Sequence, residues 1–577
     1  YDNLKAIEYM EFYASMYGIV GKEARQTSLN LMELVNLSDK TEAYVGETNN
    51  AYKRMSQHLE NPRRKVLDNI FLLLNDSFNK SVTLDFENKL IQYMHADGKY
   101  ILQNENAGQS VQHDYFQRLA YEETFNDLWN KLKKEKLVNK SVFEITNSEI
   151  FKYSPYKELT DDQFGCIEQM LSHLGTSINE NTQKNMVICG GAGTGKTVLA
   201  IFFIKTLVDI INRNSDFTNL DEVLPEDSPI LQSVSLIKLI QEHKDLKIAF
   251  VVPAPSFRGT IKKVFKATKG LKANMVIGPN DIVKEKYDIV IVDEAHRLKR
   301  NKNLANNGQY FAACKALGLE KDATQLDWIT HDKRYLTVLF YDSKQRVKID
   351  DAEDESFSSF SSNATNIGLS SQLRIKGGDN YINFINALLN NESVTYKSEN
   401  YDLCIFDDYK NMEDMIFAKN DECEGLCRVL SGIAYPWSTK IRTKNKVKAL
   451  DIDVDGDGKY LRSWNQLFND TSFITDDSHK DEIGCIYTCQ GYDLNYAGVI
   501  LGPDIYYDTA NSRIDINVKK YYKRKSVNVH NDEEAKRYIL NQYLVLLTRG
   551  IKGTYIYAVD KNLREYLKSV IKCNKKD

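Results

Sequence analysis

From residue 159 onward, the chain alternates short apolar runs with amphipathic helical patterns. Continuous apolar strands separated by helices are typical of a parallel sheet that is covered on both faces. A polar stretch, DDAEDESFSSFSSNATN at 350–366, divides the runs into two groups. The pattern therefore predicts two doubly wound α/β domains, at 159–350 and 366–577. The apolar runs are NMVICG, KIAFVVPA, YDIVIVDEA, YLTVLFYDS, YDLCIFDDY, AGVILG, YLVLLTR and GTYIYAVD.

The pattern ahead of residue 159 is different. Residues 3–36 show the periodicity of two amphipathic helices, and residues 44–132 combine a short strand with helices. A charged stretch that begins with KLKKEKLVNK is typical of a connector. We therefore expect a helical fragment at 1–43, a small α+β domain at 44–135 and a linker at 136–158.

Composition and charge narrow the class of protein. The chain has 577 residues, is 42% hydrophobic and 27% charged, and carries a formal net charge of −4. That balance gives no overall basic footprint, so any nucleic-acid binding must come from local patches. No apolar run reaches membrane-spanning length and no signal peptide is visible, so we expect a cytoplasmic protein. The nine cysteines lack metal-type spacing, which favours reduced thiols. An opening Tyr1 indicates a processed product or a truncated reading frame.

The segment VICGGAGTGKTVLAIFF carries the clearest chemistry. It fits the pattern G-x-x-x-x-G-K-[ST], with an apolar strand before it and an apolar helix after it. Glycines let backbone N–H groups surround phosphate oxygens, and the helix N-terminus adds a favourable dipole. We expect Lys196 to hold the β- and γ-phosphates and Thr197 to bind Mg²⁺. The rest of the predicted cradle consists of Gly190, Gly191, Ala192, Gly193, Thr194 and Gly195.

The segment YDIVIVDEAHRL supplies the acid that such a loop requires. Asp293 follows a buried strand and is expected to complete the Mg²⁺ shell. Glu294 is placed to orient or deprotonate the attacking water. Acids that follow a strand are commonly helix caps, but the phosphate loop favours the catalytic interpretation. The sequence therefore predicts an enzyme that hydrolyses ATP with Mg²⁺.

Further polar residues occur in a fixed order around the phosphate loop. In LTDDQ, Gln163 is placed to read adenine, and in LFYDSKQRV, Gln345 is a candidate sensor of the γ-phosphate. The second predicted domain adds candidates for contacts to the nucleotide: Arg374 in LSSQLRI, Gln490 and Gly491 in IYTCQGYDLNYAGVILGPD, and Arg549 in YLVLLTRGIKG.

This ordered set resembles superfamily 1 DNA/RNA helicases, and more closely the bacterial Schlafen-type (group 3) DNA/RNA helicase-like family. The resemblance covers about 159–567 and implies two RecA-like phosphate-loop NTPase domains. It also implies that Arg374 and Arg549 reach the γ-phosphate from the second domain, where an arginine stabilises charge in the transition state. The letters DEAH suggest superfamily 2, but that class has a Ser-Ala-Thr third motif and several arginines in its sixth motif. This chain has DSKQ and LLTRG instead.

The resemblance also implies that nucleic acid lies across both domains, held by backbone contacts and stacking. Candidate contacts are Phe257 and Arg258 after the second strand, and Thr488 near the fifth motif. The lysines of RGTIKKVFKATKGLK form a local basic patch, although such a run is commonly a solvated helix face.

The segment AYVGETNNAYKRMSQHL resembles the second half of a GIY-YIG nuclease domain. Tyr44 begins the counterpart of the Tyr-Ile-Gly strand, and Arg54 and His58 fall on one face of the next helix. The resemblance implies that Glu87 is the single metal-binding glutamate and that Asn104 is the family's late asparagine. A tyrosine that activates water, an arginine that steadies the phosphate and a carboxylate that holds Mg²⁺ form a coherent nuclease set.

The first Gly-Ile-Tyr strand of that family is missing. The segment upstream of Tyr44 instead resembles the helical region of an ABC transporter ATPase, without its signature loop and without a phosphate loop. We therefore expect two half-domains joined near Tyr44, either as a fusion or assembly product or as a diverged domain. An incomplete sheet would leave an unpaired edge. Both an active nuclease and an inactive remnant are open interpretations.

An acidic segment, DIDVDGDGKYLR, begins like a calcium-binding loop. Asp451, Asp453, Asp455 and Gly456 match D-x-[DN]-x-[DN]-G. The twelfth position should be a bidentate glutamate, but it is Arg462, and no helix pattern precedes the segment. The sequence therefore favours an acidic hairpin turn.

These motifs together predict an ATP-dependent superfamily 1-like helicase or translocase that acts on single-stranded DNA or RNA, with no membrane partner. Two alternatives stay open. The first is a nucleic-acid-stimulated ATPase that switches without unwinding. The second is a GIY-YIG endonuclease whose cleavage is gated by the ATPase half.

Overall fold

A computed structural model describes most of the motif-bearing residues. The described ranges are 42–48, 51–60, 64, 66–75, 78–104, 118, 120–191, 193–212, 239–240, 242–243, 245–301, 307–342, 345–346, 351–370, 375–397, 400–423, 425–436, 450–464, 473–474, 479–489, 493–522 and 532–572. The predicted helices at 3–36 lie outside these ranges. The chain divides into two compact units. The first comprises Tyr1–Leu171, Val198–Asp245 and Gly259–Met275, and the second comprises Ser172–Thr197, Leu246–Arg258 and Val276–Asp577.

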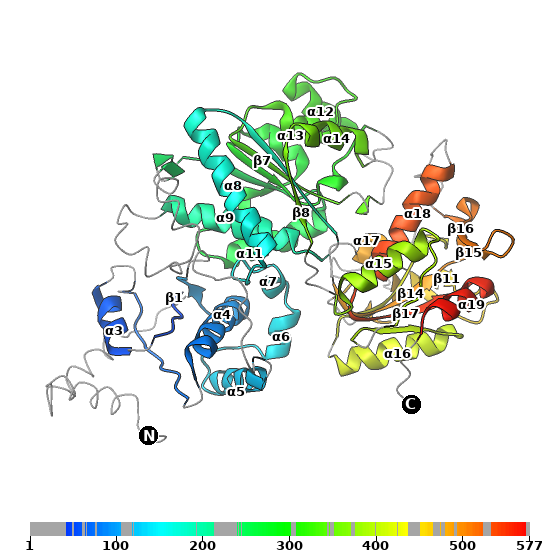
Figure 1. Cartoon of the computed structure of the whole chain (residues 1–577), viewed down its shortest axis with the longest axis horizontal. Helices are drawn as coiled ribbons and strands as arrows, with labels where there is room; N and C mark the ends of the chain where they lie inside the picture. Colours follow the sequence, from blue (N-terminus) through cyan, green and yellow to red (C-terminus); the bar gives the residue numbers. More distant parts are fainter. Residues whose placement is uncertain are drawn as a thin grey trace, which may run out of the picture. The chain divides into compact units, whose positions relative to one another are not determined.

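The first unit combines a small pair of parallel strands with helices (Figure 1). Helix α4 begins after Asn79, whose side chain accepts a hydrogen bond from the N–H of Val82, and ends at Gly98. The elements up to residue 180 are β1 (Glu42–Ala43), α3 (Ala51–Glu60), α4 (Lys80–Asp97), β2 (Ile101–Leu102), α5 (Ala120–Lys134), α6 (Val142–Asn147), α7 (Glu149–Lys152) and α8 (Asp161–Glu180). Most of α9 (Lys196–Asn212) and α11 (Pro255–Ala267), followed by η5 (Ala273–Met275), also belong to this unit.

Aromatic and aliphatic side chains hold the amino-terminal helices together. Phe125 of α5 is 1% exposed and packs edge to face against Phe86 of α4, with 5.4 Å between ring centroids. Val138 and Ile145 belong to the same buried cluster. The segment 136–158, predicted to be a linker, is thus part of this core and contains α6 and α7. Its charges are the solvated faces of amphipathic helices, which resemble a connector in sequence.

Between α3 and α4, residues 66–75 lie outside every helix and strand. Large apolar side chains in this segment face solvent, with exposed fractions of 60% for Phe71 and 66% for Leu74. Soluble domains rarely expose so many neighbouring apolar side chains, and a two-stranded sheet is marginally stable by itself. The other exposed members are Val66, Ile70, Leu72 and Leu73.

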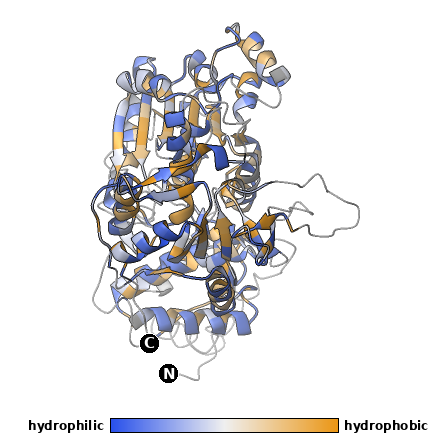
Figure 2. Ribbon diagram, turned by 90° about the vertical axis from the view of Figure 1, so that its right-hand side faces the viewer, coloured by the Kyte–Doolittle hydropathy of each residue, from blue (hydrophilic) through white to orange (hydrophobic). Residues whose placement is uncertain are grey.

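The second unit contains two large sheets, and the first has six parallel strands in the order β5-β4-β6-β7-β3-β8. Its inner strands are largely apolar and buried. Figure 2 shows hydrophobic colouring along many strand segments of the molecule. This agrees with the predicted parallel α/β architecture. The elements are β3 (Lys184–Gly190), β4 (Ile248–Val251), β5 (Val276–Ile277), η6 (Pro279–Lys284), β6 (Ile289–Val292), η7 (Ala295–Arg297), α12 (Asn307–Leu317), α13 (Gln325–His331), β7 (Leu336–Tyr341), α14 (Asp354–Ser362) and β8 (Thr365–Leu369).

The first sheet extends past the predicted break at 350–366. Helix α14 lies within that polar stretch, and β8 pairs with β3, placing Ile367 beside Ile188. The predicted end of the domain at residue 350 is therefore too early. β8 is an edge strand with alternating exposure, so it lacks the continuous apolar run that marks the inner strands.

The second sheet has seven strands in the order β11-β12-β13-β10-β14-β17-β9, all parallel except the β11–β12 pair. The apolar run YLVLLTR, predicted to be a strand, instead lies mostly in helix α18. A short buried apolar run does not distinguish strand from helix by its period. The elements are α15 (Gly378–Leu389), β9 (Asp402–Ile405), α16 (Tyr409–Glu422), β10 (Cys427–Ser431), β11 (Ile452–Asp453), β12 (Leu461–Trp464), β13 (Glu482–Gly484), α17 (Ile486–Cys489), β14 (Leu494–Leu501), β15 (Ile505–Asp508), β16 (Arg513–Ile516), η10 (Val518–Lys520), α18 (Asp532–Leu547), β17 (Gly550–Ala558) and α19 (Lys561–Val570).

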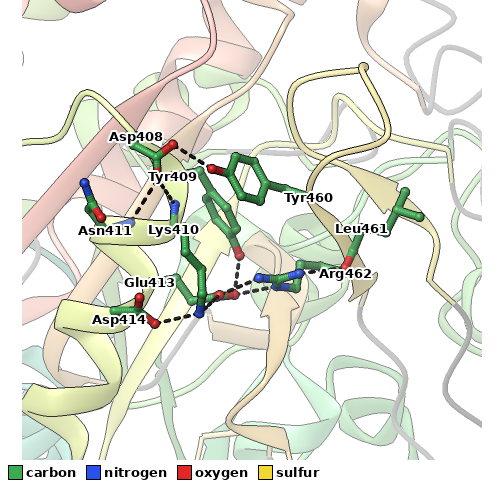
Figure 3. A network of polar contacts seen from close by, with 9 residues as sticks. All are labelled: Asp408, Tyr409, Lys410, Asn411, Glu413, Asp414, Tyr460, Leu461 and Arg462. Carbon is green, nitrogen blue, oxygen red and sulfur yellow. Dashed lines mark hydrogen bonds and ion pairs between the residues drawn. The ribbon is translucent and has the colours of Figure 1, made fainter.

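The acidic segment at 451–462 forms the predicted hairpin. Strands β11 and β12 pair antiparallel, and the carboxylate of Asp453 accepts hydrogen bonds from the N–H groups of Gly456 and Gly458 at 3.1 and 2.8 Å. Figure 3 shows how the hairpin attaches to α16: Arg462 donates to both carboxylate oxygens of Glu413, at 2.6 and 2.5 Å. Arg462, which stands where a calcium loop has its bidentate glutamate, thus holds the hairpin to α16 through a charge-assisted pair of hydrogen bonds.

Within the described ranges, no helix is both long enough and apolar enough to span a bilayer. The cysteines of these ranges form no disulfide.

Candidate nucleotide site and a second polar centre

The phosphate loop connects β3, an inner strand between β7 and β8, to α9. Gly193 and Gly195 have φ angles of 86° and 77°, in the left-handed region that favours glycine. Gly190 is required for close approach, because a Cβ atom there would lie 2.5 Å from Oγ1 of Thr194. That hydroxyl donates to the carbonyl of Gly191 at 3.1 Å. The loop therefore closes tightly, as a cradle of backbone N–H groups requires.

The two functional side chains that follow the loop have defined partners. The ammonium group of Lys196 donates to the carbonyls of Gly190 and Gly191, at 2.6 and 2.8 Å. The hydroxyl of Thr197 donates to Oδ2 of Asp293 at 2.8 Å. The structure thus brings together the loop and the acid that the sequence paired across 96 residues.

Two adjacent carboxylates follow β6 and differ in their electrostatics. Burial raises the pKa of Asp293 to about 7, and the charge of Glu294 adds to the rise. Burial also acts to raise the pKa of Glu294, but its contact with His296 and the nearby Lys196 and Arg297 hold that pKa below its usual range. Glu294 has a φ of 49°, an uncommon left-handed conformation that is typical of functional sites. Asp293 thus has a raised pKa, while Glu294 stays ionised.

Two residues that the sequence analysis did not single out complete this centre. Nε2 of His296 lies 3.1 Å from Oε2 of Glu294, at ion-pair distance. Oδ2 of Asp342 accepts a hydrogen bond from the amide of Gln345 at 2.8 Å, which holds the predicted γ-phosphate sensor after β7. Both residues lie within the segments DEAH and DSKQ, so a search of those segments for second partners would have found them.

The remaining predicted nucleotide contacts are only partly described. Arg549 is 2% exposed, and its Nε donates to the carbonyl of Val545 at 3.0 Å. Gln163 is 1% exposed, and its Oε1 accepts a hydrogen bond from the N–H of Thr160. Four predicted site residues lie outside the described ranges, namely Ala192, Arg374, Gln490 and Gly491.

The predicted nucleic-acid contacts have different surroundings. Phe257 is 3% exposed and belongs to the core, so it presents no stacking surface. Arg258 donates to the backbone carbonyls of Val252 and Pro253, at 2.9 and 3.3 Å, which anchors the loop after β4. Thr488 closes a turn by bonding to the backbone of residue 485. Phe257 was a candidate nucleic-acid contact because of its place after the second strand, and that place in the sequence does not reveal that its ring is buried.

A second polar centre forms around β1 in the first unit. The hydroxyl of Tyr44 accepts a hydrogen bond from Arg54 at 2.9 Å. The side chain of Asn104 accepts from the N–H of Val45 at 3.1 Å and donates to its carbonyl at 2.8 Å. Asn104 therefore extends the strand pairing by one residue, although the ladder itself covers only Glu42–Ala43 and not the predicted strand at 44–46. The side chain of His58 lies outside the described ones.

Glu87 of α4 lies in the same centre. Burial raises the pKa of Glu87 to about 7, and the charge of Glu47 adds to the rise, whereas Arg54 and Lys80 oppose it. Glu47 also forms an ion pair with Lys80. Glu47, which stands directly after Tyr44-Val45-Gly46 in the chain, was not predicted. In the described part of the chain, no three potential ligands of the His, Cys, Asp or Glu type gather as a metal site.

A parallel sheet with a phosphate loop after β3 and an acid after β6, two strands that both pair with β7, is an arrangement in which α/β proteins bind nucleotides at the carboxyl ends of the strands. This arrangement and the family match over residues 183–560 define the class of protein as a helicase-like nucleic-acid enzyme. The chain belongs to the family described as Schlafen group 3, DNA/RNA helicase domain, which it matches over residues 183–560. The resemblances proposed for the GIY-YIG-like and ABC-like segments lie outside this match and stay predictions.

A curated relative and several solved structures are similar to this chain. The uncharacterized protein YPL245W of Saccharomyces cerevisiae is 30% identical over 455 residues, which cover 71% of this chain and 90% of the relative. A crystal structure of the arterivirus nonstructural protein 10 helicase is 11% identical, covers 70% of this chain and 64% of its own, and has a TM-score of 0.29. This chain thus spans less than two thirds of that helicase. A Bacteroides Pif1 structure bound to single-stranded DNA is 11% identical, covers 68% and 93%, and has a TM-score of 0.25.

Proposed function

We propose that this chain is an ATP-dependent, superfamily 1-like motor that moves along single-stranded DNA or RNA. The observation that carries the proposal is the bond between Thr197 and Asp293, which joins a complete phosphate loop to its acid. Membership of a helicase-domain family supports the nucleic-acid substrate. The division into amino-terminal, first and second RecA-like domains is part of the same proposal.

The residues of this centre fit a nucleotide with Mg²⁺. A buried carboxylate with a raised pKa beside a hydroxyl is stabilised by a cation, so Asp293 and Thr197 would hold Mg²⁺, which would neutralise charge on the phosphates. Lys196 would exchange its two loop carbonyls for phosphate oxygens. Glu294 stays ionised and would orient the attacking water, while Gln345 would contact the γ-phosphate and Arg374 and Arg549 would steady its charge.

The decisive experiment is ATP hydrolysis by the purified chain, with and without single-stranded DNA or RNA. We expect nucleic acid to stimulate hydrolysis, and Lys196→Ala to reduce it by at least about 100-fold. Lys247→Ala is the matched control, because Lys247 is an exposed lysine whose partner Glu285 is also exposed. Hydrolysis that is the same in Lys196→Ala would contradict the assignment of the site.

Stimulated hydrolysis without movement would favour the alternative of an ATPase switch. A strand-displacement assay on a partial duplex separates the two. A motor displaces the strand only with ATP, whereas a switch hydrolyses ATP and leaves the duplex intact.

A second candidate function, cleavage of nucleic acid with Mg²⁺, is favoured by the contact between Tyr44 and Arg54 close to Glu87. In this proposal Tyr44 activates water, Arg54 steadies the phosphate and Glu87 holds the metal. We expect Mg²⁺-dependent nicking that Glu87→Ala abolishes and that Glu123→Ala, at an exposed position of α5, leaves unchanged. An intact substrate after incubation with the wild-type chain would identify the centre as an inactive remnant.

A further inference from the structure

Helix α4 carries two features of different character. Glu87 belongs to the Tyr44 centre near its middle, and His95 is buried in its last turn, with 3% exposed. Nε2 of His95 lies 2.9 Å from Oγ1 of Thr268, and Nδ1 lies 3.2 Å from Oγ of Ser154. Neither the proposed ATP hydrolysis nor the proposed cleavage uses this imidazole.

The partners of His95 come from helices that lead to the motor site. Thr268 follows α11, which begins directly after β4, and Lys205 lies on α9, which begins at Lys196 of the phosphate loop. Lys205 is 2% exposed and lies over the ring of Tyr156, at 5.9 Å. We call this group the His95 node; its members are His95, Ser154, Tyr156, Lys205 and Thr268.

Directional hydrogen bonds join His95 to Thr268 and Ser154, and the charged Lys205 lies beside them over the ring of Tyr156. Burial lowers the pKa of His95 to about 3, and the charge of Lys205 adds to the lowering. The imidazole is therefore neutral near pH 7, with one nitrogen as donor and the other as acceptor. Thr268 and Ser154 are themselves 3% and 0% exposed, and each has a backbone partner besides the imidazole, so a broken bond would leave a buried ring nitrogen of His95 without its partner. Because breaking these buried hydrogen bonds is costly, a shift of one helix should move the helix bonded to it.

Two further contacts attach α11 to the amino-terminal elements. Oε1 of Glu149 accepts a hydrogen bond from Thr260 at 3.0 Å, and Oε2 lies 3.8 Å from Lys263. Beyond the end of the helix, Lys269 forms an ion pair with Glu42 of β1 at 2.7 Å. Helix α11 is thus fixed near its start, at its end and beyond it.

We propose that the His95 node and these two contacts couple the Tyr44 centre to nucleotide and nucleic-acid binding, with α4 as the moving element. Nucleotide binding at the start of α9, or strand binding at the lysines of α11, displaces these helices, and the node carries the displacement to α4 and so to Glu87. Small sliding motions of packed helices are a common form of such coupling. The inference rests on the proposed ATP-driven function but does not require that the Tyr44 centre cleaves anything.

The test is hydrogen exchange of the α4 amides in the full chain, measured by mass spectrometry. The samples contain Mg²⁺ alone, a non-hydrolysable ATP analogue, or the analogue with a single-stranded oligonucleotide. A fluorescent ATP analogue measures binding separately. We expect the ligands to change the exchange rate of the peptide that spans α4 by about fivefold or more. In Thr268→Val, which keeps the shape and removes the hydroxyl, that response should disappear while the analogue still binds.

Two further variants complete the design. Thr330→Val removes a hydroxyl that bonds to the carbonyl of Leu326 in its own helix, so it should respond as the wild type does. Glu149→Gln keeps its shape on a partly exposed side chain and should reduce the response even if Thr268→Val does not fold.

The outcomes separate this inference from the proposed function. If the analogue binds and α4 does not respond, the coupling is wrong and the nucleotide site stands. If Thr268→Val and Glu149→Gln both respond like the wild type, the node is not the path and the inference is overturned. If the analogue does not bind to the wild-type chain, the proposed function fails first and the coupling fails with it.

Discussion

The two carboxylate pairs of this chain, Asp293 with Glu294 and Glu47 with Glu87, lie in contrasting surroundings. The first pair follows β6, an inner strand of a complete six-stranded sheet. The second lies beside a two-stranded pair whose neighbouring segment exposes large apolar side chains. In both pairs one carboxyl has its pKa raised to about 7 by burial and by the other acid. A similar rise in pKa therefore occurs beside a six-stranded sheet and beside a two-stranded one. The catalytic role is easier to infer beside the larger sheet, because its surroundings are more fully formed.

The largest expected effect is on the first pair. Glu294→Gln should lower kcat for ATP hydrolysis by about 100- to 10,000-fold, because the variant loses a general base but keeps the phosphate loop. Binding of an ATP analogue should be retained, which equilibrium titration can check. Glu285→Gln, at an exposed glutamate, is the control. A variant that hydrolyses ATP normally would show that the two acids do not have the separate roles that their opposite pKa shifts indicate.

A core substitution tests whether the amino-terminal helices around the second pair unfold as a cooperative unit. Phe125→Ala should destabilise the amino-terminal helices by about 3–5 kcal/mol, since it empties the centre of their cluster. Chemical denaturation followed by hydrogen exchange would localise the loss. Phe71→Ala removes the same ring from an exposed site and should cost little. Equal losses for both variants would mean that the 66–75 segment is packed in solution.

The raised pKa of Glu87 predicts a pH dependence of stability. A carboxyl whose pKa is higher in the folded chain than the ordinary 4.5 costs stability increasingly as the pH rises from about 4.5 to about 7. Glu87→Gln removes this cost, so the variant should gain stability over the wild type on the order of 2 kcal/mol more at pH 8 than at pH 5. Thermal unfolding at both values, in EDTA, measures the difference. A gain that does not change with pH would show that Glu87 is solvated.

The smallest expected effect concerns the exposed segment at 66–75, between α3 and α4. Leu74→Ser should change the free energy of unfolding by less than about 0.5 kcal/mol, because the side chain already faces solvent. It should nevertheless reduce self-association, which light scattering at increasing concentration can detect. A marked fall in melting temperature would indicate that the segment has a partner in the folded chain.

Much of the helicase-like region could be predicted because its signals are local. The phosphate loop, its strand and its helix are contiguous, β4, β6 and β7 are nearly continuous apolar runs, and β14 and β17 contain the apolar runs AGVIL and TYIYA. Strand β10 was missed because CRVLS contains a charged residue. Arg428 is nevertheless 0% exposed, because it donates to the carbonyl of Phe473 and to Asn420. Only the tertiary structure supplies those partners.

The amino-terminal region was harder to predict because its contacts join distant segments. The GIY-YIG-like pattern predicted Tyr44, Arg54 and Glu87 as site residues, and these three side chains lie close together in the structure. Glu47 and the His95 node were not predicted, since Thr268 stands 173 residues from His95 and no local spacing relates them. The segment 136–158 was wrongly predicted to be a linker for the same reason. Its apolar side chains are buried by packing with α4 and α5, which the local sequence does not show.

The attachment of α9 and α11 to the amino-terminal elements also limits how this protein can be recombined. Domains are exchanged readily where few contacts cross a boundary. Here a breakpoint at residue 158, between the amino-terminal elements and the helicase-like region, would separate His95 and Glu149 from partners that follow much later in the chain. A fusion that replaced the first 158 residues would keep Thr268, Lys263 and Lys269 but would lose the amino-terminal side chains that contact them. Successful exchange, whether by evolution or by design, therefore requires matched changes on two helices of the recipient motor.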